Sequence, residues 1–255
     1  MSDARASLSE DDFLGGKLRL KQPTRGHRAG HDAVLLAAAT PARPGERVVD
    51  LGAGVGAAGL AVAARVGAVD LVLVERDESL VDIARANLAA NGMSGRAVVL
   101  DITASAAAFA RAGLPPDSAE RILMNPPFND PARHRPSPDQ GRRGAHEEDR
   151  DTLMAWLRAA RRVLKPAGTV SLIWRADGIG RVLAALEDGF GAVTVLPVYP
   201  RPDAAAIRIL VRATKGSKAM PVLLPGVCLN AQSTEASNDV QAVLRGAAVL
   251  PLSVL

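Results

Sequence analysis

Three glycines follow an acidic residue in the segment DLGAGVG, residues 50–56. Glycines at the exit of a strand let the backbone turn sharply and approach a ligand, and the helix that follows presents free N–H groups. The overlapping stretch GVGAAG also matches the dinucleotide fingerprint, so glycines alone do not separate a nicotinamide cofactor from S-adenosylmethionine. Asp50 favours S-adenosylmethionine, because a carboxylate would repel a pyrophosphate but stabilise an ammonium or a sulfonium. The alternative for Asp50 is a capping role on a tight turn.

Two further acids stand where the next strands are expected to end. Glu75 comes about twenty residues after the glycines, where a carboxylate can accept both ribose hydroxyls of either cofactor class. Its alternative is a solvated acid at a strand end. Asp101 can accept from an adenine amino group while Ile102 packs on the ring. Carboxyl ends of parallel strands line one rim of a sheet, so these residues are expected to lie together.

The segment LMNPPF places Asn125 at the end of a fourth strand, followed by Pro126, Pro127 and Phe128. Consecutive prolines fix two φ angles and remove two N–H donors, which leaves a rigid turn that presents carbonyl oxygens. An exocyclic amine that attacks a methyl sulfonium needs acceptors for its N–H groups. The Asn125 side-chain carbonyl and the Pro126 backbone carbonyl suit that task, and Phe128 can stack a flat ring. The alternative is an ordinary Pro-Pro loop that ends a strand.

The elements that must position these residues alternate strictly from Glu46 onward. Expected strands occupy residues 47–51, 70–75, 96–101, 120–125 and 168–174, and expected helices occupy 57–66, 79–92, 104–113, 151–164 and 179–188. This alternation indicates right-handed βαβ units in a doubly wound sheet. Residues 191–199 and 205–213 are typical of a closing antiparallel pair. The prediction is therefore an α/β, Rossmann-like fold with a mostly parallel seven-stranded sheet and helices on both faces.

Both ends of the chain depart from this alternation. Residues 1–12 are polar and are expected to be frayed, whereas residues 13–23 predict a short strand or hairpin with a basic outer face. A helix is expected over 29–39 and another over 235–244. We expect three parts: an N-terminal segment, 1–45; a catalytic domain, 46–230; and a C-terminal helical tail, 231–255.

Residues 126–147 contain five prolines and no apolar period, which predicts a long loop beside the Asn-Pro-Pro turn. Arginines in such a loop could contact the phosphates of a nucleic acid; the alternative is a solvated loop in an arginine-rich protein. Basic residues near the N-terminus and in the last long strand could extend the same surface. The predicted nucleic-acid contacts are Lys17, Arg19, Arg28, Arg133, Arg135, Arg142 and Arg143, with Arg208, Arg212, Lys215 and Lys218 as possible extensions.

The bulk composition limits the class of protein. The net charge of +4 permits a polyanionic partner without requiring one. A single cysteine excludes an internal disulfide framework and a thiolate-rich metal site, and no metal is expected. The polar N-terminus does not read as a signal peptide, and no apolar stretch reaches membrane-spanning length. We therefore expect a cytoplasmic protein without a membrane partner; the oligomeric state is left open.

The motifs DLGAGVG, LVLVE, VLD and NPPF, in this order and spacing, resemble those of class I S-adenosylmethionine-dependent methyltransferases. The lead-in GGKLRLKQPTRGHRAGHDAVLLAAA is similar to the N-terminal segment of the bacterial tRNA(Val) adenine-N6 methyltransferase family. The resemblance implies S-adenosylmethionine as cofactor, tRNA as partner and the Asn125–Phe128 turn at the target base. The implied cofactor-binding residues are Gly30, Asp32, Asp50, Gly52, Ala53, Gly54, Gly56, Glu75, Arg76, Asp101, Ile102 and Asn125.

Several alternatives stay open at this point. Guanine-N2 transfer to rRNA and glutamine-N5 transfer to a protein also use an Asn-Pro-Pro turn, so the turn does not separate them. A nucleotide-linked oxidoreductase would use GVGAAG, although nothing else in the chain serves hydride transfer. A catalytically silent RNA-binding module of the same fold is the non-enzymatic alternative, and the intact NPPF motif disfavours it. Many relatives carry Tyr where this chain has Phe128.

Overall fold

The computed structural model describes residues 7–25, 28–127, 140–230 and 235–253, with the backbone alone over 140–150 and 235–239. Its strands are β1 (Leu8–Phe13), β2 (Leu18–Pro23), β3 (Arg47–Leu51), β4 (Asp70–Glu75), β5 (Arg96–Val99), β6 (Ala119–Met124), β7 (Leu164–Arg175), β8 (Phe190–Tyr199), β9 (Arg208–Lys215), β10 (Val222–Leu223) and β11 (Val227–Cys228). Its α-helices are α1 (His31–Ala39), α2 (Ala57–Val66), α3 (Glu78–Ala90), α4 (Ala106–Arg111), α5 (Gln140–Val163), α6 (Ile179–Leu186) and α7 (Glu235–Leu244), with 3-10 turns at Ala176–Gly178 and Pro251–Ser253.

The central sheet has the strand order β10-β8-β9-β7-β6-β3-β4-β5, and β11 also pairs with β8. Five neighbouring strands, β5, β4, β3, β6 and β7, are parallel. Strand β9 runs antiparallel to both of its neighbours, β7 and β8. The prediction of a mostly parallel seven-stranded sheet with a closing antiparallel pair is confirmed. The strands β10 and β11 extend the sheet to nine strands. Each has only two residues, which is too short for a recognisable sequence pattern.

Two apolar layers cover the two faces of the sheet, because successive side chains of a strand point to opposite faces. Val48 and Leu71 pack with α1, α2 and α3 on one face. Val49 and Val72 pack with α4, α5 and α6 on the other. Asp50 is two residues after Val48 in β3, so its side chain points to the same face of the sheet, which α2 covers. Among the described residues, none of the helices combines the length and apolar character that a membrane crossing requires.

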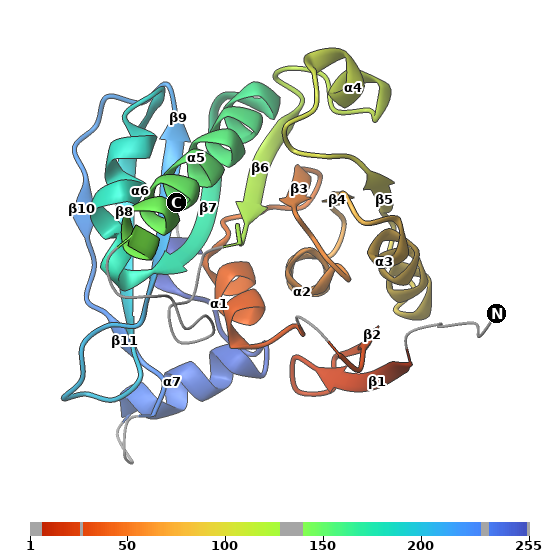
Figure 1. Cartoon of the computed structure of the whole chain (residues 1–255). Helices are drawn as coiled ribbons and strands as arrows, with labels where there is room; N and C mark the ends of the chain where they lie inside the picture. Colours follow the sequence, from red (N-terminus) through yellow and green to blue (C-terminus); the bar gives the residue numbers. More distant parts are fainter. Residues whose placement is uncertain (1–6, 26–27, 128–139, 231–234, 254–255) are drawn as a thin grey trace.

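The N-terminal strands form a separate antiparallel hairpin that lies beside α2 and α3 (Figure 1). Leu18 and Leu20 are buried, and Arg19 points outward, as the alternation predicted. The expectation that residues 1–12 are frayed is wrong over Leu8–Asp12, which belong to β1. That strand has no regular alternation of apolar and polar residues. Instead, its acidic residues lie opposite basic residues of β2, with Glu10 opposite Lys21 and Asp12 opposite Arg19. Such cross-strand pairs of opposite charge stabilise a sheet.

The expected loop over 126–147 is too long. Helix α5 begins at Gln140, so residues 140–147 are helical, and Arg142 and Arg143 lie on a helix and not on a loop. The opening of this helix is polar and has no apolar stripe, which is why periodicity placed its start later. Strand β7 also begins four residues before the expected start at 168.

Candidate functional site

Strand register brings the predicted cofactor and amine-binding residues to one rim of the sheet. Leu51, the last residue of β3, pairs with Val74 of β4 and with Met124 of β6. Gly52 and Asn125 therefore follow directly from paired positions on neighbouring strands. Glu75 ends β4 and pairs with Val99 of β5. The glycine loop thus leaves the sheet between the Asn-Pro-Pro turn and the Glu75 carboxylate.

The glycine loop uses left-handed backbone at three positions. Gly52, Gly54 and Gly56 have φ angles of 66°, 55° and 91°, which disfavour any residue with a Cβ. The Ala53 N–H donates to the Val74 carbonyl at 2.9 Å, which fixes the loop against the end of β4. A Cβ on Gly52 would lie 2.1 Å from the Trp156 ring, whereas a Cβ on Gly54 would meet no atom within 4 Å. The loop is therefore packed on one side and open at Gly54.

Asp50 lies beneath this loop. Its side chain is buried, and Oδ2 accepts the Gly59 N–H of α2 at 2.9 Å. This contact satisfies a backbone N–H in the first turn of α2, whose N-cap residue is Gly56, and a role of Asp50 toward a cofactor stays a prediction. Burial raises the pKa of Asp50 to about 7; the bond from Gly59 opposes the rise, and the nearby Glu75 carboxylate adds to it.

Glu75 connects the end of β4 to the glycine loop. Its Oε2 accepts the Gly54 N–H at 3.0 Å, and its Oε1 accepts the N–H groups of Arg76 and Asp77 at 2.8 and 3.1 Å. The side chain is only partly buried. The carboxylate is thus held at the open side of the loop by three backbone donors, where it can also accept hydroxyl groups.

Asp101 lies at the same rim, although β5 ends at Val99 and not at Asp101 as expected. The chain stays aligned because the Leu100 N–H donates to the Glu75 carbonyl at 2.9 Å. Asp101 is exposed, and hydrogen bonds from the side chain and backbone of Thr103 lower its pKa. Ile102 packs against the apolar layer of the α5 face.

The Asn-Pro-Pro turn follows β6. Asn125 is partly exposed, Pro126 is buried and Pro127 is exposed, so the turn is anchored at its middle residue. Phe128 lies outside the described residues, and its proposed stacking stays a prediction.

Gly30 and Asp32 lie at the start of α1. Gly30 is the N-cap of the helix, and a Cβ there would meet no atom within 4 Å. Asp32 Oδ2 accepts from Arg208 Nε of β9 at 3.0 Å. Strand β9 runs antiparallel to β7, and Arg208 pairs with Arg175, the last residue of β7. Asp32 is thereby held beside the carboxyl rim.

Within the described part of the chain, three of the predicted nucleic-acid residues bind groups of the protein itself. Lys17 Nζ donates to the Gly246 carbonyl at 2.5 Å, Arg19 pairs with Glu10 at 3.3 Å, and Arg28 pairs with Asp11 at 2.7 Å. Lys215 pairs with Asp117 at the opposite end of β9 from Arg208, so its assignment to the same surface is wrong. Arg133 and Arg135 lie outside the described residues.

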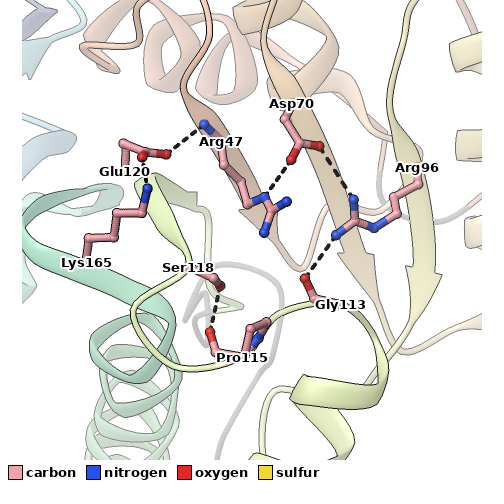
Figure 2. Close-up of polar contacts among 8 residues, drawn as sticks. All are labelled: Arg47, Asp70, Arg96, Gly113, Pro115, Ser118, Glu120 and Lys165. Atoms are coloured by element: carbon pink, nitrogen blue, oxygen red, sulfur yellow. Dashed lines mark hydrogen bonds and ion pairs between the residues drawn. The ribbon is translucent and has the colours of Figure 1, made fainter.

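The opposite rim, at the amino ends of the strands, carries alternating charges (Figure 2). Arg47 Nε donates to Asp70 at 2.6 Å, and Arg96 Nη1 contacts the other oxygen of Asp70 at 3.5 Å. Glu120 accepts the Arg47 N–H at 2.8 Å and pairs with Lys165. These three ion pairs, together with the hydrogen bond from the Arg47 N–H, connect five neighbouring strands, β5, β4, β3, β6 and β7. The charged residues of this rim therefore hold neighbouring strands together at the end of the sheet that lies away from the glycine loop.

Two residues that the sequence analysis missed contact the glycine loop. Trp156 of α5 packs against Gly52, and Asn87 of α3 donates a hydrogen bond to the Val55 carbonyl at 3.0 Å. Both left a signal in the sequence. Trp156 is one of only two tryptophans, and Asn87 is a polar residue within the buried stripe of Val81, Ala84 and Leu88. Over the described residues, no group of His, Cys, Asp or Glu side chains forms a metal-binding cluster.

Residues 29–198 match the model of a protein family described as the methyltransferase small domain. A tRNA1(Val) (adenine(37)-N6)-methyltransferase of Bacteroides thetaiotaomicron is 29% identical over 73% of this chain and 76% of its own length. The protein of the same name from Serratia proteamaculans is 30% identical over 74% of this chain and 71% of its own length.

Solved structures show the same fold. A protein from Agrobacterium tumefaciens, described as a predicted O-methyltransferase, superposes with a TM-score of 0.71 at 30% identity. The superposition covers 86% of this chain and 98% of the Agrobacterium chain.

Proposed function

This chain belongs to the methyltransferase small domain family, and on that premise we propose that it transfers a methyl group from S-adenosylmethionine to the N6 amine of an adenine in tRNA. That the chain is an S-adenosylmethionine-dependent methyltransferase follows from the family and its relatives. The position of Asn125-Pro126-Pro127 beside the glycine loop carries the proposal that the acceptor is an amine. The names of the relatives support adenine N6 in tRNA.

The residues of the rim fit the cofactor. When bound, S-adenosylmethionine supplies a methyl group on a positively charged sulfur. Glu75 would accept the ribose hydroxyls, Asp101 the adenine amino group, and the space over Gly54 leaves room for close approach of the ligand. The lowered pKa of Asp101 keeps it ionised, which suits an acceptor. Gly30 and Asp32 would close the site at the methionine end.

The Asn-Pro-Pro turn would hold the amine. Asn125 Oδ1 and the Pro126 carbonyl would accept its two N–H groups and so direct the nitrogen lone pair toward the methyl group. Catalysis of this kind depends on positioning and on exclusion of water. No general base is required in the transfer step, because the nitrogen becomes acidic once it carries the methyl group. The target base loses its stacked neighbours when it leaves the RNA loop, and Phe128 would stack on the base in their place.

Asp50 gives cofactor binding a pH dependence. Its pKa of about 7 means that it is mostly protonated at lower pH, and a protonated carboxyl stabilises the cationic methionine end less. Affinity for S-adenosylmethionine should therefore rise as the pH increases from about 5.5 to 7, by at most about tenfold per pH unit. An α-amino group titrates at about 7.7–8.0, so the cofactor keeps its charge across this window.

Calorimetry over this pH range checks the Asp50 prediction. Asp50→Asn, which cannot ionise, should bind weakly and without this slope. If the parent protein shows no slope, or if Asp50→Asn keeps the parent slope, Asp50 does not face the cofactor charge and only holds the first turn of α2 through Gly59.

A partner surface for RNA remains part of the proposal. Arg142 and Arg143 near the start of α5, with Arg133 and Arg135, follow the Asn-Pro-Pro turn in the chain and would contact phosphates. Replacing Arg142 and Arg143 by alanine should weaken RNA binding. The slope of log K for RNA binding against log salt concentration should become less steep by about 0.7–0.9 for each phosphate contact that is lost. Cofactor affinity should not change. Fluorescence titration at several salt concentrations measures the slope, and an unchanged slope would remove these arginines from the interface.

The test of the proposed function must distinguish adenine N6 from other methyl acceptors. Guanine N2 and glutamine N5 fit the same turn, and the description of the Agrobacterium structure names oxygen transfer. The purified protein, supplied with methyl-deuterated S-adenosylmethionine, should be offered unmodified tRNA, unmodified rRNA and total protein in parallel. Mass analysis of the digests is expected to find the label in N6-methyladenosine from tRNA. Label in another nucleoside, in a ribose oxygen or in glutamine would reject the proposed acceptor and identify the correct one.

A further inference from the structure

Asn87 of α3 is completely buried and uses both ends of its side-chain amide. Its Oδ1 accepts the Lys21 N–H at 2.8 Å, and its Nδ2 donates to the Lys21 carbonyl at 2.9 Å. The same Nδ2 donates to the Val55 carbonyl of the glycine loop at 3.0 Å. One side chain therefore connects strand β2 of the N-terminal hairpin to the loop between Gly54 and Gly56.

Asn91 lies one helical turn later and binds the same strand. Its Oδ1 accepts the Arg19 N–H at 2.9 Å, and its Nδ2 donates to the Arg19 carbonyl at 2.8 Å. A side-chain amide offers the same donor and acceptor as a peptide group, so the two asparagines take the place of a neighbouring strand on the open edge of β2. Asn91 makes its remaining bond to the Asn87 carbonyl at 2.8 Å and not to the glycine loop.

The hairpin is also fixed to the start of α1. Gln22 of β2 is buried; its Oε1 accepts the Ala29 N–H at 3.0 Å, and its Nε2 donates to Asp11 of β1 at 2.7 Å. Ala29 directly precedes Gly30, the N-cap of α1. The hairpin is therefore connected both to the glycine loop and to the residue that precedes Gly30, two segments of the predicted cofactor site.

We propose that Asn87 is a positioning residue of the cofactor site, through which the docked hairpin fixes the glycine loop in its binding conformation. Val55 lies between two residues with left-handed backbone, so its carbonyl direction defines the shape of the loop. Glu75 holds the loop at the Gly54 N–H, and Asn87 holds the next residue by its carbonyl. Loss of the Asn87 donor leaves that buried carbonyl unpaired and frees the loop to rearrange. This inference rests on the proposed placement of S-adenosylmethionine on this loop.

The test compares Asn87→Ala with the matched variant Asn91→Ala by calorimetry with S-adenosylmethionine. Both variants remove hairpin contacts, and both are expected to lower the melting temperature. Only Asn87→Ala should raise the Kd, by about tenfold, which corresponds to about 1.4 kcal/mol. Asn87→Asp keeps the acceptor for Lys21 but cannot donate to Val55, so it should bind as weakly as Asn87→Ala. Equal Kd values for Asn87→Ala, Asn91→Ala and the parent would overturn the proposal.

A measurement on the parent protein covers the case in which the Asn87 variants do not fold. Hydrogen exchange with and without S-adenosylmethionine should show slower exchange in the hairpin peptide that contains Arg19 and Lys21, together with the glycine loop. Protection of the loop without protection of the hairpin would refute the coupling. A parent protein that does not bind S-adenosylmethionine would instead refute the placement of the cofactor, so the two failures are distinguishable.

Discussion

Replacing Asn125 by alanine is expected to lower the methyl-transfer rate about 10²–10³-fold, the range for removing one well-placed polar group at a reacting centre. The side-chain carbonyl would accept an N–H whose hydrogen bond strengthens as the nitrogen begins to carry positive charge. The loss should therefore fall on the transition state and leave cofactor affinity nearly unchanged, because the cofactor-binding loop and acids lie at the carboxyl ends of β3, β4 and β5.

Single-turnover kinetics with saturating cofactor measures this loss without interference from product release. Asn125→Asp is the matched control, since it keeps an acceptor oxygen at nearly the same position, and it should lose less activity than Asn125→Ala. A normal Kd for S-adenosylmethionine in both variants would show that the site is intact. If Asn125→Ala transferred methyl groups at the parent rate, the Asn-Pro-Pro turn would not hold the amine.

Replacing Gly52 by alanine is expected to destabilise the fold by about 2–5 kcal/mol, since left-handed backbone and overpacking both add to the cost. The φ angle of 66° strains any L-residue with a Cβ, and the new methyl group would lie 2.1 Å from Cη2 of Trp156. The tryptophan is itself packed in the apolar layer of α5, so the ring has little room to move. Urea unfolding of the parent and the variant measures the difference.

Gly54→Ala provides the control for the Gly52 prediction. Its φ of 55° brings a similar backbone strain of about 1–2 kcal/mol, but its Cβ would meet no atom within 4 Å. In a double-mutant cycle, Trp156→Ala should relieve part of the cost of Gly52→Ala and none of the cost of Gly54→Ala. Equal destabilisation by the two glycine variants would show that the ring contact contributes nothing.

The central elements were predictable because their burial leaves a clear pattern. The bounds of β3, α2 and β4 agree with the prediction, as do those of α7. Buried β-branched runs indicate the strands, and Gly56 and Gly67 flank α2. Strand β1 was missed because charge pairing with β2 stabilises it, and sequence periodicity does not detect pairing between distant segments. The first turns of α5 were missed for the related reason that they carry no apolar stripe.

The position of the candidate site was predictable, whereas its internal contacts were not. Parallel strands bring their carboxyl ends to one rim, so Glu75 and Asn125 could be placed together from the order of the strands alone. The bond from Gly59 to Asp50 depends on which face of β3 the acid occupies and on how closely α2 approaches. The contacts of Trp156 and Asn87 with the loop join segments that are far apart in the sequence, and their geometry exists only in the folded chain.

Mass mapping of modified nucleosides in tRNA tests the central claim most directly. Three strains are compared: one with the parent gene, one with the gene deleted, and one in which the deletion carries Asn125→Ala. Deletion should remove N6-methyladenosine from a defined tRNA position, the parent gene should restore it, and Asn125→Ala expressed at an equal level should leave most of that position unmodified. An unchanged N6-methyladenosine content of tRNA in the deletion strain would contradict the account.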